Sequence, residues 1–257
     1  MYETVLFEVS DSVARLTLNR PNKLNSFNEK MISELRHALK EARKSAEIRA
    51  ILLTGAGRAF CAGQDLASVD EQADHGEMLR QYYNPLIEEI VSCEKPVIAA
   101  VNGVAAGAGF SLALAADFRI VSEKASFIQA FIHVGLVPDS GSTYFLPRLV
   151  GNAKALELMT LGEKIHADEA KELGIATKLI SIDQWDEEIH SFAKRAAMIP
   201  TKAFALMKQN LQQSWELSLS ALLEKEAFAQ RVAGLTADHK EGVQAFLEKR
   251  KPDFQGK

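Results

Sequence analysis

The stretch from Pro96 to Asp117, PVIAAVNGVAAGAGFSLALAAD, is the feature that most constrains the fold of this chain. It consists almost entirely of small apolar residues and is interrupted by Asn102-Gly103. The order of residues predicts a strand over Val97–Val101, a glycine-rich turn, and a helix over about Gly107–Ala116. Small residues let backbones approach closely, and the first N–H groups of a helix have no intrahelical partner. Because such groups and the helix dipole stabilise negative charge, the stretch predicts half of a site for a developing oxyanion.

Three other readings of this stretch compete with an oxyanion site. Its length suits a membrane span, but Asn102-Gly103 and Gly107-Ala108-Gly109 interrupt it, and it is rich in Ala and Gly rather than Leu and Ile. A dinucleotide-binding fingerprint would need a glycine at position 112, where Leu112 stands. A buried helix that packs tightly for structural reasons alone stays open.

The bulk properties are those of an ordinary globular protein. A chain of 257 residues with 47% hydrophobic and 25% charged residues can bury a full core, as one large domain or one domain with a small appendage. The net charge of −4 gives no general attraction to nucleic acid or to anionic membranes. The first residues alternate like a strand and do not resemble a signal peptide. With only Cys61 and Cys93 present, a disulfide scaffold is not expected, and we expect a reducing, cytoplasmic location.

Strand and helix patterns alternate along the first half of the chain. Residues 2–8 and 12–19 predict a β-hairpin, and the further expected elements are a helix after the cap Asn28, strands at 50–54, 97–101 and 118–121, and a helix at 79–91. This alternation predicts an α/β fold with parallel strands and right-handed crossovers. Beyond residue 140 a strand pattern recurs only near 176–180, and helices are expected near 141–161, 167–173, 184–197, 200–213, 217–234 and 238–248. We therefore divide the chain into a β/α core (1–195) and an α-helical region (196–257), with Asp183 and Pro200 as candidate joints.

Two small-residue turns each follow an expected parallel strand. The first is Ala59–Leu66, AFCAGQDL, and the second is Gly103–Leu112, GVAAGAGFSL. Loops that follow parallel strands build ligand sites in open sheets. One N–H group from each turn can therefore converge on a single carbonyl oxygen.

Taken together, the motifs resemble the crotonase (enoyl-CoA hydratase/isomerase) superfamily. They are the two turns above, together with NRPNKLN (19–25), KPVIAAVNG (95–103), AAD (115–117), LPRLVG (146–151), ADEAKELG (167–174) and EG…FLEKRK (241–251). The resemblance implies a crotonase (ClpP-like) spiral fold of ββα repeats with an α-helical C-terminal trimerisation region. It also implies an acyl-CoA substrate and a homotrimer or hexamer. No metal is implied, nor any cofactor besides the CoA that the substrate itself carries.

The resemblance also assigns candidate site residues. The backbone N–H groups of Gln64 and Ala108 correspond to the oxyanion hole that holds the thioester oxygen. Two fixed donors aimed at an enolate oxygen lower the barrier to removal of the α-proton. Further candidates for contact with the substrate or its CoA are Lys23, Leu24, Ala62, Asp65, Leu66, Gly107, Ser111, Phe131 and Lys249.

The two catalytic glutamates of the family's hydratases are absent. The matching positions hold Ser111 and Phe131, neither of which can shuttle a proton as a carboxylate does. A carboxylate does occur at Asp139, where some isomerases and dehalogenases of the family carry a catalytic aspartate. The neighbouring residues 126–131 and 135–141 are similar to those of the phenylacetate-pathway isomerases, which convert a ring epoxide to an oxepin. The chain is therefore expected to be an acyl-CoA isomerase, active in phenylacetate or fatty acid metabolism, with Asp139 as its proton shuttle and apolar Phe131 raising the pKa of Asp139.

Several alternatives stay open at this point. Asp139 precedes a helical run, so it can instead be a helix cap. An enoyl-CoA hydratase, a thioesterase or a dehalogenase would use the same fold, and a non-catalytic acyl-CoA- or RNA-binding scaffold is a candidate of another class. The polar stretch 69–78 is a candidate lid over the acyl pocket. His133 is expected to have a structural role, and Gln129 and Tyr144 are weaker candidates for the acyl site.

Overall fold

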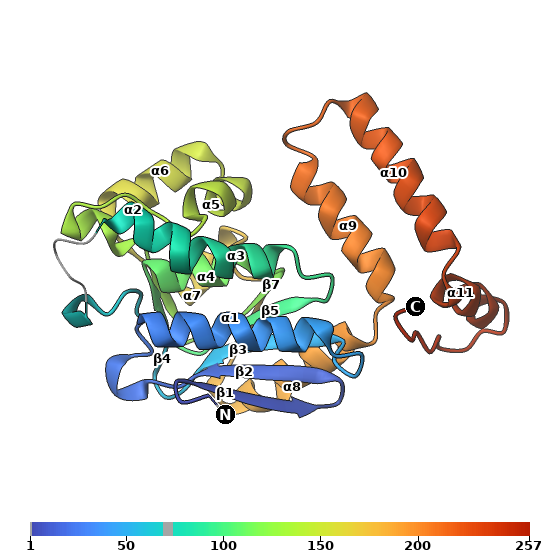
Figure 1. The fold of residues 1–257 in the computed structure, drawn as a ribbon, viewed down its shortest axis with the longest axis horizontal. Helices are drawn as coiled ribbons and strands as arrows, with labels where there is room; N and C mark the ends of the chain where they lie inside the picture. The colour runs from blue at the N-terminus through green and yellow to red at the C-terminus, as the bar shows by residue number, and fades with distance from the viewer. Residues whose placement is uncertain (1, 69–73) are drawn as a thin grey trace.

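The computed structural model describes residues 2–68 and 74–257. Its main sheet has six strands in the order β1-β2-β3-β5-β7-β10 (Figure 1). The strands are β1 (Val5–Ser10), β2 (Val13–Leu18), β3 (Ala50–Gly55), β5 (Val97–Val101), β7 (Phe118–Ser122) and β10 (Lys178–Ile180). β1 and β2 pair antiparallel, and each later neighbour pairs parallel. The predicted hairpin and the predicted parallel sheet are both confirmed.

A second sheet contains four short strands in the order β4-β6-β8-β9. They are β4 (Ala59–Cys61), β6 (Val104–Ala106), β8 (Ser126–Ile128) and β9 (Lys164–His166). β4, β6 and β8 closely follow β3, β5 and β7 along the chain, so strands of the large and small sheets alternate before each helix. This is the predicted α/β architecture of ββα repeats. The four strands themselves were not predicted, because three residues are too few to show an alternating pattern.

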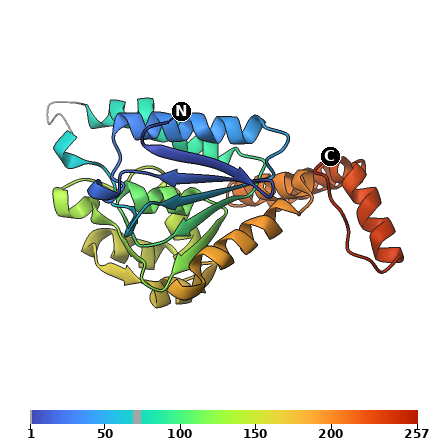
Figure 2. The same cartoon turned by 90° about the horizontal axis from the view of Figure 1, so that it is seen from below.

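Helices cover both faces of the main sheet (Figure 2). α1 (Glu29–Lys44) packs on the face that carries Ile51 and Leu53, and α8 (Trp185–Ala197) packs on the face that carries Ala50 and Leu52. Alternate residues of β3 are therefore buried on opposite sides, as the two-residue period of a strand requires. The predicted cap of α1 is confirmed, since the Asn28 side chain accepts a hydrogen bond from the Met31 N–H at 2.9 Å.

The run that begins at Pro96 is divided among three elements. β5 and β6 are followed by α4 (Ala108–Ala115), a helix of eight residues, all of them buried. Among the residues that the structure describes, no helix is both long and apolar enough to cross a membrane.

The remaining helices and helical turns lie on the core of the molecule. They are α2 (His75–Met78), the π-helical segment η3 (Leu79–Tyr83), α3 (Asn84–Val91), η4 (Ala130–Val134), α5 (Ser142–Val150), α6 (Asn152–Leu161) and α7 (Ala167–Glu172), with the short turns η1 (Pro21–Lys23), η2 (Leu66–Ser68) and η5 (Ile182–Gln184). The single helical stretch expected near 141–161 is two helices, because Gly151 separates them with φ of 78°. Of the candidate lid, residues 69–73 lie outside the described residues, and His75–Met78 form α2.

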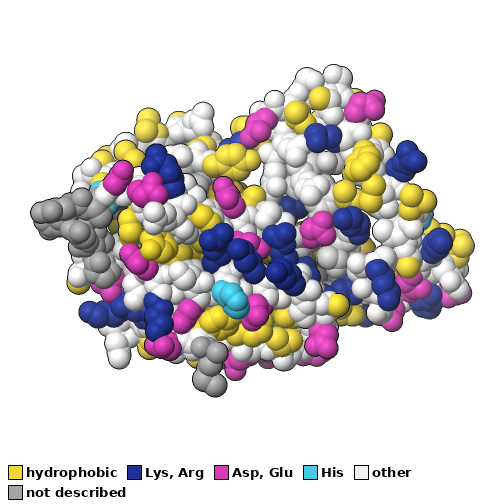
Figure 3. Space-filling model, viewed as in Figure 1, with side chains coloured by type: hydrophobic (Ala, Val, Ile, Leu, Met, Phe, Trp, Pro, Cys, Tyr) yellow, Lys and Arg dark blue, Asp and Glu magenta, His cyan; other side chains and the backbone are white. Residues whose placement is uncertain are grey.

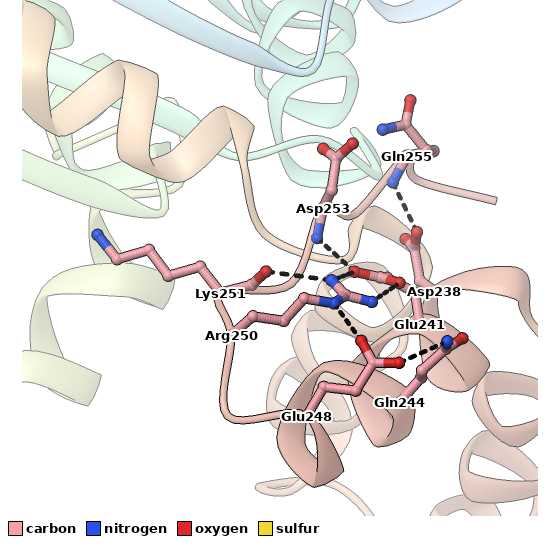
Figure 4. A network of polar contacts seen from close by, with 8 residues as sticks. All are labelled: Asp238, Glu241, Gln244, Glu248, Arg250, Lys251, Asp253 and Gln255. Carbon is pink, nitrogen blue, oxygen red and sulfur yellow. Dashed lines mark hydrogen bonds and ion pairs between the residues drawn. The ribbon is translucent and has the colours of Figure 1, made fainter.

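The C-terminal helices α9 (Thr201–Gln213), α10 (Leu219–Gly234) and α11 (Ala237–Leu247) extend away from the sheets (Figures 1 and 2). The chain end folds back onto α11. Arg250 pairs with Glu241 and Glu248, and the Asp238 carboxylate accepts a hydrogen bond from the Gln255 N–H (Figure 4). The Gly256 N–H donates to the same carboxylate. The helical C-terminal region is thus as predicted, while the domain boundary at 195/196 stays a prediction.

Candidate active site

A cavity of about 410 Å³ lies between the two predicted turns, α2, η3 and the segment from η4 to Asp139. Most of its walls are apolar. The residues lining it are Ala62, Gly63, Gln64, Leu66, His75, Gly76, Met78, Leu79, Tyr83, Gly107, Ala108, Ala130, Phe131, Val134, Leu136, Val137 and Asp139. A mostly apolar cavity with a few converging polar groups is the usual form of a small-molecule site.

The first turn is held in place by the segment that follows β2. The Phe27 N–H donates to Gly63 O at 2.7 Å, and the Asp65 N–H donates to Phe27 O at 2.9 Å. In a parallel bridge of this kind, the residue between the two bonded positions directs its own N–H to the opposite side. The N–H of Gln64 therefore faces away from Phe27.

The second turn requires glycine because it approaches the first so closely. Gly107 adopts φ of 50°, and a Cβ atom added at Gly109 would lie 2.2 Å from the Cys61 carbonyl oxygen. A Cβ atom at Gly63 would lie 2.8 Å from Ala106 O and 3.5 Å from Ala108 N. These contacts place the start of α4 directly against the first turn, as predicted. The N–H of Ala108, in the first turn of α4, has no partner within the helix.

The Asp139 carboxyl lines the same cavity from the segment that precedes α5. Burial raises its pKa, and a hydrogen bond from the Ser140 hydroxyl at 2.8 Å opposes that rise. The helix-cap alternative is not what the structure has: the N-cap of α5 is Gly141, with no side-chain capping bond. Within the described residues that line the cavity, Asp139 is the one carboxylate.

Ser111 differs from its predicted position. Its side chain is fully buried and is not among the cavity-lining residues. Its hydroxyl donates to the backbone oxygen of Asp139 at 3.0 Å and lies 2.8 Å from Ser142 Oγ. The Gln129 amide donates to the same Ser142 hydroxyl, and Gln129 is likewise buried away from the cavity. Ser111 therefore supports the main chain of Asp139 from behind instead of lining the pocket.

Four predicted substrate contacts also lie outside the cavity lining. The backbone oxygen of Leu24 accepts from the Ala62 N–H at 3.0 Å, and Asp65 pairs with Arg20 at 2.9 Å, so both brace the first turn. Lys23 ends the turn η1. Lys249 follows α11, at the opposite end of the molecule from α2 (Figures 1 and 2).

The other candidate side chains have structural partners. A ring nitrogen of His133 lies 3.0 Å from Gly162 O, as expected of a structural role. The Tyr144 hydroxyl donates to Gln212 O at 3.0 Å, and Tyr144 does not line the cavity.

Tyr83 is a cavity residue that the sequence pattern did not reveal. It is 5% exposed, and its hydroxyl donates to the Gln64 side-chain oxygen. Burial, followed by the charge of Asp139, raises its pKa, so the phenol stays neutral. Its only sequence signal was a place in the helix expected at 79–91, which does not relate it to Gln64 or Asp139. The described residues contain no group of three or more His, Cys, Asp or Glu that could hold a metal ion.

Comparison with known proteins identifies the family. The model for "Enoyl-CoA hydratase/isomerase" matches residues 8–257. The chain belongs to the enoyl-CoA hydratase/isomerase family. It is 44% identical to a 1,2-epoxyphenylacetyl-CoA isomerase of Escherichia coli K12, over 100% of both chains, and 45% identical to a "Probable enoyl-CoA hydratase" of Rhodobacter capsulatus, over 100% of this chain and 99% of that one.

Solved structures agree on the crotonase fold. An enoyl-CoA hydratase from Bacillus anthracis superposes with a TM-score of 0.91 at 34% identity, covering 99% of this chain and 100% of that one. An enoyl-CoA hydratase/isomerase from Cupriavidus metallidurans gives 0.92 at 32% identity, covering 100% and 97%. The named relatives include both isomerases and hydratases, so the family alone leaves the reaction open.

Proposed function

We propose that this protein is an acyl-CoA isomerase that moves a double bond, or opens a ring epoxide, through an enolate. The observation that carries the proposal is that Asp139 is the single carboxylate among the described residues lining a cavity where the family's hydratases place two glutamates. Phe131 forms apolar wall at one of those positions, and Ser111 is buried and hydrogen bonded at the other. One carboxylate is sufficient for an isomerisation, since it takes a proton from one carbon and returns it to another.

The backbone N–H groups of Gln64 and Ala108 act as the oxyanion hole. A Cβ atom added at Gly63 would lie 3.5 Å from the Ala108 nitrogen, so the two turns lie close together, and both donors are proposed to reach one thioester oxygen. Each such donor typically contributes about 3–4 kcal/mol to stabilising the transition state. The thioester oxygen becomes an enolate oxygen once the proton on C2 is removed.

Asp139 acts as the proton shuttle. In a 3,4-enoyl thioester it takes the proton from C2, and the electron pair of that C–H bond forms the enolate. The same oxygen then returns the proton to C4 on the same face while the double bond shifts to C2–C3. Burial supports this role, because a raised pKa makes a carboxylate a better base near neutral pH.

The test is Asp139→Asn, assayed with a 3-enoyl-CoA and with a ring-1,2-epoxyphenylacetyl-CoA. We expect turnover to be lost while the affinity for a CoA thioester stays within severalfold of the parent. The control is Asp186→Asn, since the Asp186 side chain is 83% exposed on α8. Full activity in Asp139→Asn would show that the assignment is wrong.

The hydratase is the second candidate, favoured by the 45% identical relative. It predicts a rapid loss of the conjugated thioester absorbance of crotonyl-CoA. A non-catalytic scaffold predicts RNA or acyl-CoA binding without turnover on any of these substrates. Isomerisation without hydration supports the proposal over both.

We further propose a cytoplasmic homotrimer or hexamer that needs no metal and no cofactor apart from the substrate's CoA. Large apolar side chains are exposed on the C-terminal helices, among them Leu219, Phe228, Val243, Phe246 and Leu247, and Figure 3 shows such side chains at the surface over α10. Lys23, Leu24 and Asp65, beside the first turn, are proposed to contact the CoA. Lys249 is proposed to do so from a neighbouring subunit, because α11 lies far from its own cavity. Sedimentation of the protein checks the assembly, and Lys23→Ala checks the CoA contact through KM.

A further inference from the structure

Among the described residues, the Ser140 hydroxyl is the hydrogen-bond partner that the structure gives the Asp139 carboxylate. It donates to Asp139 Oδ1 at 2.8 Å, and Ser140 is 4% exposed. The main chain of Asp139 is fixed separately: its carbonyl oxygen accepts from the Ser111 hydroxyl and from the Ser142 N–H, each at 3.0 Å. The backbone and the carboxylate are thus held by different groups.

The conformation of Ser140 is unusual for a serine. Its φ is 52°, a left-handed conformation that costs energy for residues with a Cβ atom and is free for glycine. The next residue, Gly141, is also left-handed, with φ of 82°. The backbone of this turn would therefore be satisfied by glycine at position 140. Serine adds one group that glycine lacks, the hydroxyl that binds Asp139.

We propose that Ser140 is a positioning residue that holds Oδ1 of Asp139 and leaves Oδ2 to exchange the proton with substrate. The inference rests on the proposed role of Asp139 as proton shuttle. The hydroxyl keeps its own proton throughout: Oδ2 takes the proton from C2, and the same oxygen returns it to C4. Because a donor to a carboxylate favours the charged form, the hydroxyl also keeps Asp139 ionised to lower pH.

Other ionisable side chains lie on the elements around the cavity. Tyr83, on η3, stays protonated because burial raises its pKa. His75, on α2, is exposed and lines the same cavity. His133, on η4, is bound to Gly162 O, and Arg148, on α5, stacks on Tyr144 with 3.5 Å between the guanidinium carbon and the ring centre. His75, an exposed imidazole that lines the same cavity, is therefore the group that needs a separate control.

The experiment compares Ser140→Ala with Ser140→Gly, measuring kcat/KM for the isomerase substrate between pH 4 and 9. Both variants lack the hydroxyl, but only glycine relieves the left-handed backbone. We expect the midpoint of the acidic limb of the kcat/KM profile to move upward by about one pH unit in both variants. The reason is that losing a hydrogen bond to a charged carboxylate raises its pKa by about that much. Their melting temperatures should differ, with Ser140→Gly the more stable.

His75→Gln serves as the control and should leave the acidic limb where it is. The inference would be overturned if the midpoint of the acidic limb were unchanged in both Ser140 variants. It would also be overturned if the midpoint moved in Ser140→Ala alone, because the effect would then follow the backbone and not the hydroxyl. A limb that disappears in His75→Gln would also overturn it. Asp139→Asn in the same assay separates the two hypotheses: activity there refutes the shuttle itself, whereas an inactive Asp139→Asn with unshifted Ser140 variants refutes only the role of Ser140.

Discussion

Lys208 joins the C-terminal helices to the core, and its replacement by Met is expected to destabilise the fold strongly. Its ammonium lies 2.9 Å from the Asp117 carboxylate and 3.1 Å from the backbone oxygens of both Ile90 and Cys93. The side chains of Lys208 and Asp117 are 8% and 13% exposed. The substitution therefore leaves a buried carboxylate without its cation and two carbonyl groups without their donor.

The expected loss follows from these contacts. Removing one partner of a buried ion pair costs about 3–5 kcal/mol, and about 4 kcal/mol is reasonable here because the Val97 N–H still donates to Asp117 at 2.8 Å. For a chain of this size that corresponds to a fall in Tm of about 10 °C. Lys202→Met, on the same helix, is the matched control. Lys202 pairs with Glu94 at 3.2 Å, with both side chains about half exposed, so its loss should cost less than about 1 kcal/mol.

The destabilisation should also depend on pH. Burial raises the pKa of Asp117, and Lys208 opposes that rise, so the pKa should rise further in Lys208→Met. At pH values between the pKa of Asp117 in the unfolded state and its raised pKa in the folded state, the folded state binds more protons than the unfolded state. The free energy of unfolding therefore falls as pH rises through this window. Denaturant unfolding at several pH values measures this. Adding Asp117→Asn should recover part of the loss at neutral pH. Equal, pH-independent losses in Lys208→Met and Lys202→Met would refute the reasoning.

Two further predictions concern the turns that form the site. Ala108→Pro removes one proposed oxyanion donor at the first position of α4, where proline is tolerated, so kcat/KM should fall about 100- to 1000-fold while the circular dichroism spectrum stays near-native. Ala108→Gly keeps the N–H group, so its kcat/KM should stay close to that of the parent. An active Ala108→Pro would contradict the donor role. Gly109→Ala places a Cβ atom 2.2 Å from Cys61 O and should lower the free energy of unfolding, measured with denaturant, by about 1–3 kcal/mol or more. Gly234→Ala is the control: its Cβ atom would have nothing within 4 Å, so the substitution should be neutral or slightly stabilising.

The elements with a clear period or a strong turn signal could be predicted from the sequence. The second hairpin strand, α1 with its Asn28 cap, β3, β5 and the start of α4 lie within a residue or two of the expected positions, and the first hairpin strand begins three residues later than expected. The four strands of the small sheet were missed, because three-residue strands are defined by their neighbours rather than by their own pattern. The break between α5 and α6 at Gly151 was missed as well, although its glycine was visible.

In the site, the local pattern predicted two small-residue turns after parallel strands, and the family resemblance assigned Gln64 and Ala108 within them as proposed oxyanion donors. Contacts that form across the fold could not be predicted in this way. Tyr83 was not found, since its contact with Gln64 depends on how η3 packs over the first turn. Ser111 was named as a candidate substrate contact but does not line the cavity; a helix that is buried all round has no polar face from which a side chain's direction can be inferred.

The order of small residues, glycines and apolar runs determined by itself that two turns would follow parallel strands and lie close together, because close approach excludes larger side chains locally. The family resemblance pointed to Asp139, but only the tertiary structure shows that this residue lines the same cavity as those turns. Asp139 reaches it through a turn fixed by Ser111 and Ser142, and its ionisation depends on burial among side chains far away in the chain. Desolvation and hydrogen bonding depend on all the atoms that surround a group. Because those atoms come from residues far apart in the sequence, a local sequence pattern does not show them.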